Sequence, residues 1–347
     1  MEPKLEEAII ELTRSCNLRC LHCGSDCGDG QEERTELDYL EWIKIIQDLK
    51  DFGLNKIVFS GGEPTIRHGF VQLMEYCHKI GFKFGFISNG FLFTPSLIEA
   101  LEKYKPFAAG ISLDGLHKTH NQIRQSEVSW SNALGSIGEL QRLQIPVCIS
   151  TTINRLNHSE LLNLAHFLNF LEISMWQVQL SMPSGRMRDH SDLLIDEAIF
   201  KSVCLDLIKI RKLYPAIRAQ GADCFCLAQT GLIREGGWPG CGAGIYAIGI
   251  DTYGNVMPCL SMRDYPTCGN LLEKSMAEIW HSKAFDFNRQ FQSTDLGENC
   301  SNCSYGVECR GGCNSQSLAY SGNLHNSPFC FYRSFSTNPQ PRGDGVL

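Results

Sequence analysis

The stretch of sequence that decides the fold is residues 8–23, AIIELTRSCNLRCLHC, in which an apolar run passes directly into three cysteines. The first six of these residues are mostly apolar and include two isoleucines, which is typical of a buried strand. The cysteines follow at the spacing C-x3-C-x2-C, as Cys16, Cys20 and Cys23. Because ligands bind at the carboxyl ends of strands in parallel α/β folds, this position predicts a metal or ligand site.

Further strands and helices alternate downstream of this first strand. Strands are predicted at residues 56–60, 83–88, 107–113, 146–152 and 175–181. Amphipathic patterns predict helices at residues 37–52, 71–80, 96–104, 130–143, 159–170 and 192–212. Each strand is thus followed by enough chain for a crossover helix. Six such units predict an α/β fold with a partial (β/α)6 TIM-like barrel, and a doubly wound open sheet fits the same periodicity.

The last third of the chain has a different composition. From about residue 222 to residue 332 it is rich in glycine and cysteine and has only short apolar runs, which predicts a loop-rich domain held by metal. We therefore expect four parts: a barrel over residues 1–215, a bridging region over 216–237, a small Cys-rich domain over 238–335 and a flexible tail over 336–347.

Composition narrows the class of protein. The chain has 347 residues with a net charge of −7, which argues against a nucleic-acid partner, and 43% of its residues are hydrophobic, which excludes a disordered chain. It has neither a secretory signal nor an apolar run of about 18 residues, so we expect a cytoplasmic protein without a membrane partner. In that reducing compartment, 17 cysteines indicate metal binding or catalysis rather than disulfides.

The first three cysteines admit two interpretations. A [4Fe–4S] cluster takes one thiolate per iron, so three cysteines would leave one iron open to another ligand. A structural zinc ion needs four ligands, which His22 or Cys27 would complete. The second strand runs into residues 60–64, SGGEP, where paired glycines let the backbone approach a ligand and Glu63 offers a carboxylate to a cation. On its own, this segment is equally compatible with an ordinary turn.

Together with ISNG at residues 87–90, after the third strand, these motifs resemble the radical S-adenosylmethionine (SAM) enzymes. The resemblance covers roughly residues 8–185. It implies a partial barrel and a [4Fe–4S] cluster on Cys16, Cys20 and Cys23, with SAM bound to the open iron through its amino and carboxylate groups.

The resemblance also implies a set of SAM-binding side chains, which are His22, Glu63, Ser88, Asn89, Ser112 and Arg124. Glu63 would face the SAM amino group, and Arg124 would pair with the SAM carboxylate, because a guanidinium binds a carboxylate well. His22 stands where the family often has an aromatic residue, and its imidazole can stack on adenine.

A second group of cysteines lies in the Cys-rich region. The spacing C-x2-C-x5-C-x3-C over residues 300–313 alone would also suit a zinc knuckle. With C-x12-G-x4-C over residues 241–259, and with Cys330, it resembles the SPASM domain of radical SAM enzymes that modify peptides. The resemblance implies two auxiliary [4Fe–4S] clusters. The outer set of ligands would be Cys300, Cys303, Cys309 and Cys330, and the inner set Cys241, Cys259 and Cys313.

The inner set is one ligand short of four. Either Cys224, Cys226 or Cys268 folds in, or the inner cluster has an open iron, and we favour the open iron. Three further cysteines lie on apolar patterns and are expected to be buried structural thiols: Cys77, Cys148 and Cys204. Four side chains are conceivable general bases: Asp114, Glu235, Tyr246 and Asp251.

The resemblance implies an enzyme that cleaves SAM reductively to a 5′-deoxyadenosyl radical and abstracts a hydrogen from its substrate. We expect a ribosomally made peptide as substrate, a thioether or carbon–carbon crosslink as product, and flavodoxin or ferredoxin as electron donor. Leu260 stands where sulfatase-maturing relatives carry an aspartate, which argues against that activity. Only about seven residues precede the first strand, so a leader peptide would meet the enzyme body or a separate leader-binding protein. The alternatives are dehydrogenation of a small molecule, and a non-catalytic zinc or iron–sulfur protein.

Overall fold

The computed structural model of the chain describes residues 2–28, 35–226 and 240–335. Its strands join one sheet in the order β10-β9-β8-β1-β2-β3-β4-β5-β6-β7. Their bounds are β1 Glu7–Glu11, β2 Lys56–Ser60, β3 Lys83–Ser88, β4 Ala109–Ser112, β5 Val147–Ile153, β6 Met175–Leu180, β7 Ala219–Gly221, β8 Ala247–Ile250, β9 Asn255–Met257 and β10 Gly269–Asn270. All neighbours from β8 through β1 to β7 pair in parallel, and β9 pairs antiparallel with β8 and β10.

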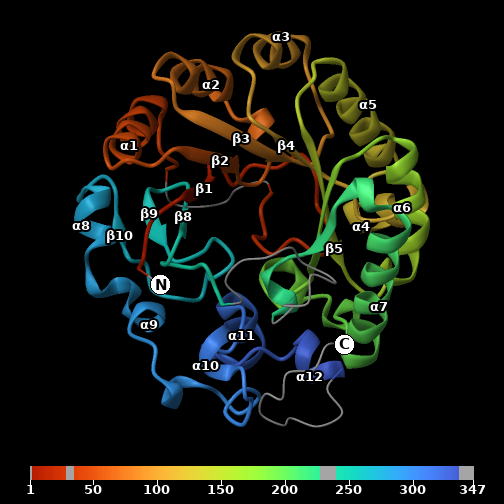
Figure 1. Cartoon of the computed structure of the whole chain (residues 1–347). Coiled ribbons are helices and arrows are strands. Elements are labelled where there is room, and N and C mark those ends of the chain that lie inside the picture. The colour runs from red at the N-terminus through yellow and green to blue at the C-terminus, as the bar shows by residue number, and fades with distance from the viewer. Residues whose placement is uncertain (1, 29–34, 227–239, 336–347) are drawn as a thin grey trace.

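Helices cover the outside of this sheet (Figure 1). Their bounds are α1 Tyr39–Asp51, α2 Phe70–Lys79, α3 Pro95–Tyr104, α4 His117–Arg124, α5 Ser129–Arg142, α6 Leu161–Phe170 and α7 Glu197–Leu213. The sequence sets these boundaries locally. For example, α1 begins with a capping box between Asp38 and Glu41, and turns Trp42, Ile45 and Leu49 into the core.

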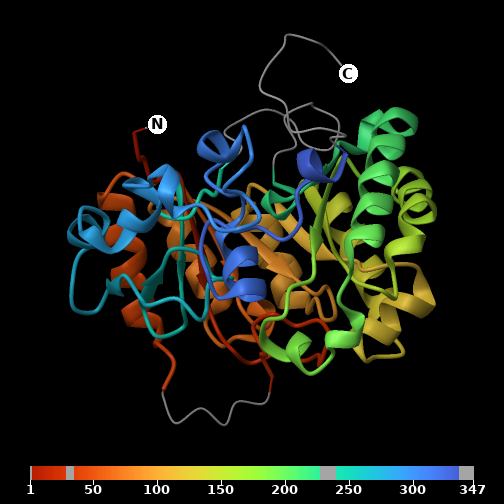
Figure 2. The same ribbon diagram turned by 90° about the horizontal axis from the view of Figure 1, so that it is seen from below.

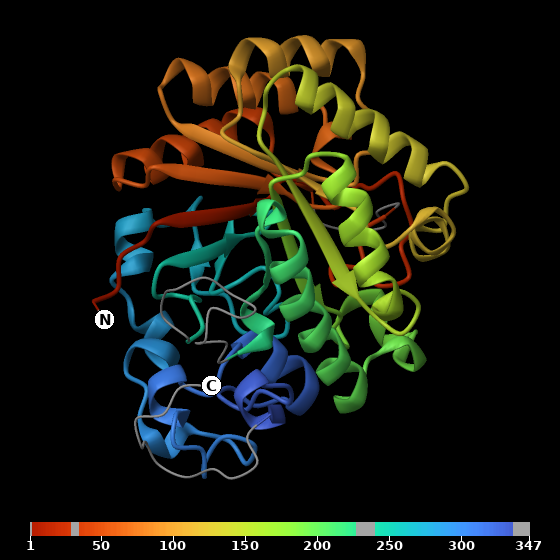
Figure 3. The same ribbon diagram turned by 45° about the vertical axis from the view of Figure 1, so that its right-hand side comes forward.

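The sheet curls into a partial barrel, which confirms the expected α/β fold. A C-terminal segment, residues 276–335, runs from the side of α1 to the side of α7 and so closes the ring of helices (Figure 1), and it is the blue part of the chain in Figures 2 and 3. It contains the short helices α8 Met276–Trp280, α9 Asp286–Arg289, α10 Gly306–Cys309, α11 Asn314–Ser321 and α12 Phe331–Phe335. No helix in the described part of the chain is long and apolar enough to cross a membrane.

The expected four-part division of the chain stays a prediction. β7 to β10 continue the barrel sheet beyond residue 215, so the sheet and the Cys-rich region share strands. The expected tail over 336–347 and residues 227–237 of the expected bridging region lie outside the described residues.

Candidate functional site

The loop that carries Cys16, Cys20 and Cys23 follows β1 and is held by the turn that follows β2. The amide of Gly62 donates to the Thr13 carbonyl at 2.7 Å, and the amide of Glu63 donates to the Ser15 carbonyl at 2.9 Å. A Cβ atom on Gly62 would lie only 2.2 Å from that Ser15 oxygen. The glycine is therefore required by the contact with the cysteine loop, a reason that the sequence motif alone does not give.

Glu63 lies at the centre of one half of the site. Its carboxylate is fully buried and accepts hydrogen bonds from the Ser88 hydroxyl at 2.8 Å and from the Asn89 amide at 2.7 Å. Burial raises the pKa of Glu63, while the bonds from Thr65, Asn89 and Ser88 lower it. The Asn89 side chain also donates to Cys16 Sγ at 3.8 Å. The structure thus brings Glu63, Ser88 and Asn89 together beside Cys16.

Asp114 joins the residues of the other half. Arg124 Nε donates to Asp114 Oδ2 at 2.7 Å, while Arg124 Nη1 donates to Cys20 Sγ at 3.7 Å. His22 Nε2 lies 2.8 Å from the same Asp114 oxygen. Burial would raise the pKa of Asp114, but Arg124 and His22 outweigh it and hold the pKa well below its usual range. Asp114 is therefore a carboxylate engaged in an ion pair with Arg124 and a hydrogen bond with His22, and these partners make it a poor general base.

The thiols of the cysteine loop stay free of disulfides. Burial is the main cause that raises the pKa of Cys16 to about 11, and it also raises the pKa of Cys20. Both thiols are thus protonated at neutral pH, and a bound metal would have to displace their protons. Cys27 donates to Glu11 Oε1 at 3.7 Å, so Cys27 and His22, the two alternatives for the fourth ligand of a zinc site, each have another partner.

Arg186, which sequence reasoning missed, holds the cysteine loop from the far edge of the sheet. It lies in the loop after β6, and its guanidinium donates to the carbonyls of Cys20 at 2.8 Å and Cys27 at 2.7 Å. Its own amide donates to the Cys23 carbonyl at 2.9 Å. Ser112, the remaining expected SAM contact, ends β4 beside Ser150 of β5 and is half-buried.

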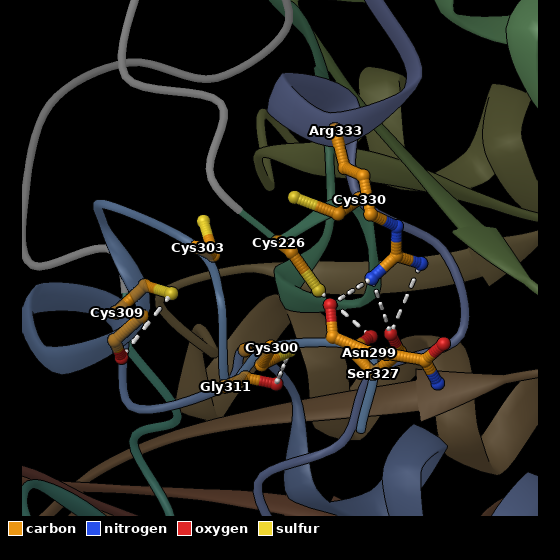
Figure 4. A pocket seen from close by; sticks show the side chains of 11 residues that line it. Cys226, Asn299, Cys300, Cys303, Cys309, Gly311, Ser327, Cys330 and Arg333 are labelled. Atoms are coloured by element: carbon orange, nitrogen blue, oxygen red, sulfur yellow. Dashed lines mark hydrogen bonds between the residues drawn. The ribbon is translucent and has the colours of Figure 1, made fainter. Parts of the chain in front are cut away.

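The outer set of cysteines gathers in the C-terminal segment. Figure 4 shows a pocket whose lining includes all four members of the outer set, Cys300, Cys303, Cys309 and Cys330. Cys226 lines the same pocket, and Arg333 closes one side of it. A pocket lined by thiols is chemically suited to an iron–sulfur cluster.

Two members of the inner set lie together. Cys241 is buried in one apolar cluster against which Cys259 packs, and burial is the main cause that raises the pKa of Cys241, with the Cys313 thiol adding to it. Within the described ranges, no group of three or more His, Cys, Asp or Glu side chains is placed to hold a metal ion as it stands. A cluster differs from such a site, because each thiol ligates a separate iron.

The remaining expected residues serve the fold. Cys77 and Cys204 are buried in the hydrophobic core, and Cys148 is half-buried in β5. Asp251 accepts from the amides of Tyr253 and Asn255 in the turn between β8 and β9. Glu235 lies outside the described residues.

Comparisons with known proteins agree with this geometry. Residues 10–168 match the radical SAM superfamily, and residues 241–304 match the SPASM iron–sulfur cluster-binding domain. The AdoMet-dependent heme synthase of Methanosarcina barkeri is 26% identical over 341 residues, which are 93% of this chain and 95% of that protein. The mycofactocin maturase MftC of Mycolicibacterium smegmatis is 30% identical over 317 residues, 87% of this chain and 76% of that protein.

A solved structure shows the same fold. The crystal structure of Streptococcus suis SuiB bound to S-adenosylmethionine superposes with a TM-score of 0.74 at 19% identity, over 91% of this chain and 75% of that one. The superfamily match implies a [4Fe–4S] cluster with SAM, and the C-terminal match implies auxiliary iron–sulfur clusters. The buried cysteine sets suit these cofactors, and the non-catalytic alternative falls away because the relatives are named as enzymes. The chain is an enzyme that belongs to the radical SAM superfamily and carries a C-terminal SPASM domain.

Proposed function

We propose that this enzyme is a peptide maturase that forms a thioether or carbon–carbon crosslink in a ribosomally made peptide. The observation that carries the proposal is the similarity to the maturase MftC, which extends over 87% of this chain. A leader-binding partner and an electron donor such as flavodoxin or ferredoxin are part of the proposal.

In this proposal Cys16, Cys20 and Cys23 hold the SAM-cleaving cluster. When bound, the reduced cluster and SAM supply the 5′-deoxyadenosyl radical that removes a hydrogen atom from the substrate. The chain's own contribution is orientation. Glu63 is held by Ser88 and Asn89 before any ligand arrives, and so offers a fixed carboxylate for the SAM amino group.

Arg124 and His22 complete the proposed SAM contacts. Asp114 fixes both side chains, so that Arg124 can pair with the SAM carboxylate and His22 can lie beside the adenine without a search through rotamers. Ser112 is the last contact in the proposed set. The C-terminal segment, which lies across the open side of the sheet, would limit the access of water to the radical.

The test is mass spectrometry of candidate precursor peptides after anaerobic incubation with SAM and dithionite. We expect a loss of about two mass units, with one 5′-deoxyadenosine formed per event, because two hydrogens leave when a bond closes. The control is the triple variant with Cys16, Cys20 and Cys23 changed to Ala, which should form no 5′-deoxyadenosine. Continued formation by that variant would refute the proposed cluster site.

A second candidate function is dehydrogenation of a small molecule. The similarity to an AdoMet-dependent heme synthase, over 95% of that protein's length, favours an iron porphyrin precursor as the substrate. Incubating the reduced enzyme and SAM with such precursors distinguishes the two candidates. Heme that appears by absorption and mass, with no change in any peptide, would replace the maturase proposal.

A further inference from the structure

The turn that follows β7 carries two buried thiols that motif matching leaves without a role. It is a short 3-10 helix, Asp223–Phe225, and it ends at Cys226, whose φ of 55° lies in the left-handed region. The exposed fraction is 2% for Cys224 and 3% for Cys226. Phe225 separates the two thiols along the turn, and their contacts with the two cysteine sets differ.

Cys226 belongs to the side of the outer set. Its thiol lines the outer pocket and donates to the Ser327 hydroxyl at 2.9 Å, as Figure 4 shows. A Cβ atom built on Gly312 would lie 2.3 Å from Cys226 Sγ, so the backbone just before Cys313 packs directly on this thiol. The turn that carries Cys226 is therefore packed against the backbone next to Cys313, a member of the inner set.

Cys224 lies on the side of the inner set. Leu180, the last residue of β6, donates its amide to Cys224 Sγ at 3.3 Å. Two residues further on, Met182 lies 3.9 Å from the Ser315 hydroxyl, and that hydroxyl lies 3.1 Å from Cys313 Sγ. The chain at the end of β6 thus contacts Cys224 directly and Cys313 through Ser315, and both thiols belong to the same core cluster.

Cys268 lies elsewhere. It precedes β10, is only half-buried, and its thiol faces the Ala284 carbonyl at 4.0 Å. Apart from burial, the charge that bears on its pKa is that of Arg289. Of the three candidates for the missing ligand, Cys226 packs in one cluster with Cys309 and Cys330 of the outer set, and the thiol of Cys268 contacts the Ala284 carbonyl, which leaves Cys224.

We propose that Cys224 supplies the fourth thiolate of the inner auxiliary cluster. This inference rests on the ligand sets of the proposed function. On ligation, the thiol gives its proton to solvent and its sulfur bonds the open iron, while the Leu180 amide hydrogen-bonds to that sulfur. A cluster with four cysteine ligands has no iron open to substrate, so its role is electron transfer. This proposal takes the alternative of a fourth cysteine in place of the open iron that the sequence favoured.

The experiment uses the full chain in which Cys16, Cys20 and Cys23 are changed to Ala, so that only the auxiliary clusters remain after anaerobic reconstitution. We expect about eight irons per chain in this background. Adding Cys224→Ala should remove at least about one of them and change the EPR and Mössbauer spectra of one cluster. Cys224→Ser, which keeps an oxygen ligand, should shift the same spectra with less loss of iron.

Matched variants make the outcome decisive. Cys226→Ala, on the same turn, and Cys268→Ala should leave the spectra of the inner cluster unchanged. Unchanged iron and spectra in Cys224→Ala would overturn the inference, and a change in Asp223→Asn instead would assign the position to that neighbouring carboxylate. Cys241→Ala shows whether such a result concerns Cys224 alone or the whole inner ligand set. If it too changes nothing, the inner ligand set of the proposed function is wrong.

Discussion

Asp114 orients two of the proposed SAM contacts, because Arg124 and His22 both bind its Oδ2 atom. It is fully buried at the end of β4, and its other oxygen accepts from the Thr152 amide at 2.9 Å. A buried carboxylate with three partners on different elements fixes their relative positions. Its effect on SAM binding would therefore be indirect, through the two side chains that it positions.

Asp114→Asn should destabilise the fold, because it leaves the buried Arg124 guanidinium without its anion. Breaking a buried ion pair costs about 3–5 kcal/mol, so we expect the free energy of unfolding in urea to fall by about that amount. The matched control is Asp264→Asn, which removes an exposed pair with Arg188 and should cost at most about 1 kcal/mol. Equal losses for the two variants would contradict the central role of Asp114.

The pH dependence of stability gives an independent check on Asp114. Its pKa is lowered in the folded state, so the unfolded chain takes up the proton first as pH falls. The stabilisation is complete above the unfolded pKa of about 3.9 and is lost as pH falls toward the folded pKa. We expect unfolding midpoints measured from pH 7 to pH 3 to fall more steeply for the wild type than for Asp114→Asn. Parallel curves would show that another carboxyl group controls acid unfolding.

Among single residues, the sequence allowed prediction of those that stand at a characteristic spacing within a short motif. Cys16 and Glu63 are recognisable because each lies in a short motif directly after a strand. The roles of Asp114 and Arg186 were not predictable, since their partners lie many residues away and meet them only when the barrel has closed. No spacing within a motif reports such a contact.

Among the helices, those with an apolar stripe were predicted from the sequence, whereas α4 was not predicted. The sequence of α4, HKTHNQIR, has little apolar periodicity, yet His120 and Arg124 are buried. His120 is satisfied by the Asp114 amide at 3.1 Å and by the Ser129 hydroxyl at 2.9 Å. Polar side chains can be buried when each has a hydrogen-bond partner. The hydrophobic pattern of the helix sequence does not show those partners, because they lie on other elements.

The loop after β6 should control how tightly the cysteine loop is held. Arg186→Ala removes two hydrogen bonds to carbonyls of that loop, each worth about 1 kcal/mol. We expect alkylation of Cys20 in the metal-free protein to become faster by on the order of tenfold, measured site by site by mass spectrometry. Arg188→Ala, two residues away, should leave this rate unchanged. An unchanged rate in Arg186→Ala would show that other contacts hold the loop.

At the scale of the whole molecule, one strand joins the two cysteine regions. β1 pairs with β2 on one side and with β8 on the other, so the strand that precedes the first cysteine loop also pairs with the strand that leads, through β9, to Cys259. The distance between the SAM site and the auxiliary sites is therefore set by a continuous sheet. The sequence predicted both regions from their motifs, but pairing between strands about 240 residues apart has no local signal.

An ion pair crosses the same junction. Arg263, four residues after Cys259, binds Glu11 of β1, and the exposed fraction of the Glu11 side chain is 1%. Arg263→Ala removes the nearer cation from the buried Glu11 carboxylate and leaves Arg14 at 3.8 Å. We therefore expect the free energy of unfolding to fall by about 2–3 kcal/mol, less than the complete loss of a buried ion pair costs. If the pair couples the two regions, the double variant with Glu11→Gln should lose clearly less than the sum of the single losses. Lys56→Ala, which breaks the more exposed pair with Glu7, should cost at most about 1 kcal/mol. Additive losses at Glu11 and Arg263 would mean that backbone pairing alone joins the Cys-rich region to the barrel.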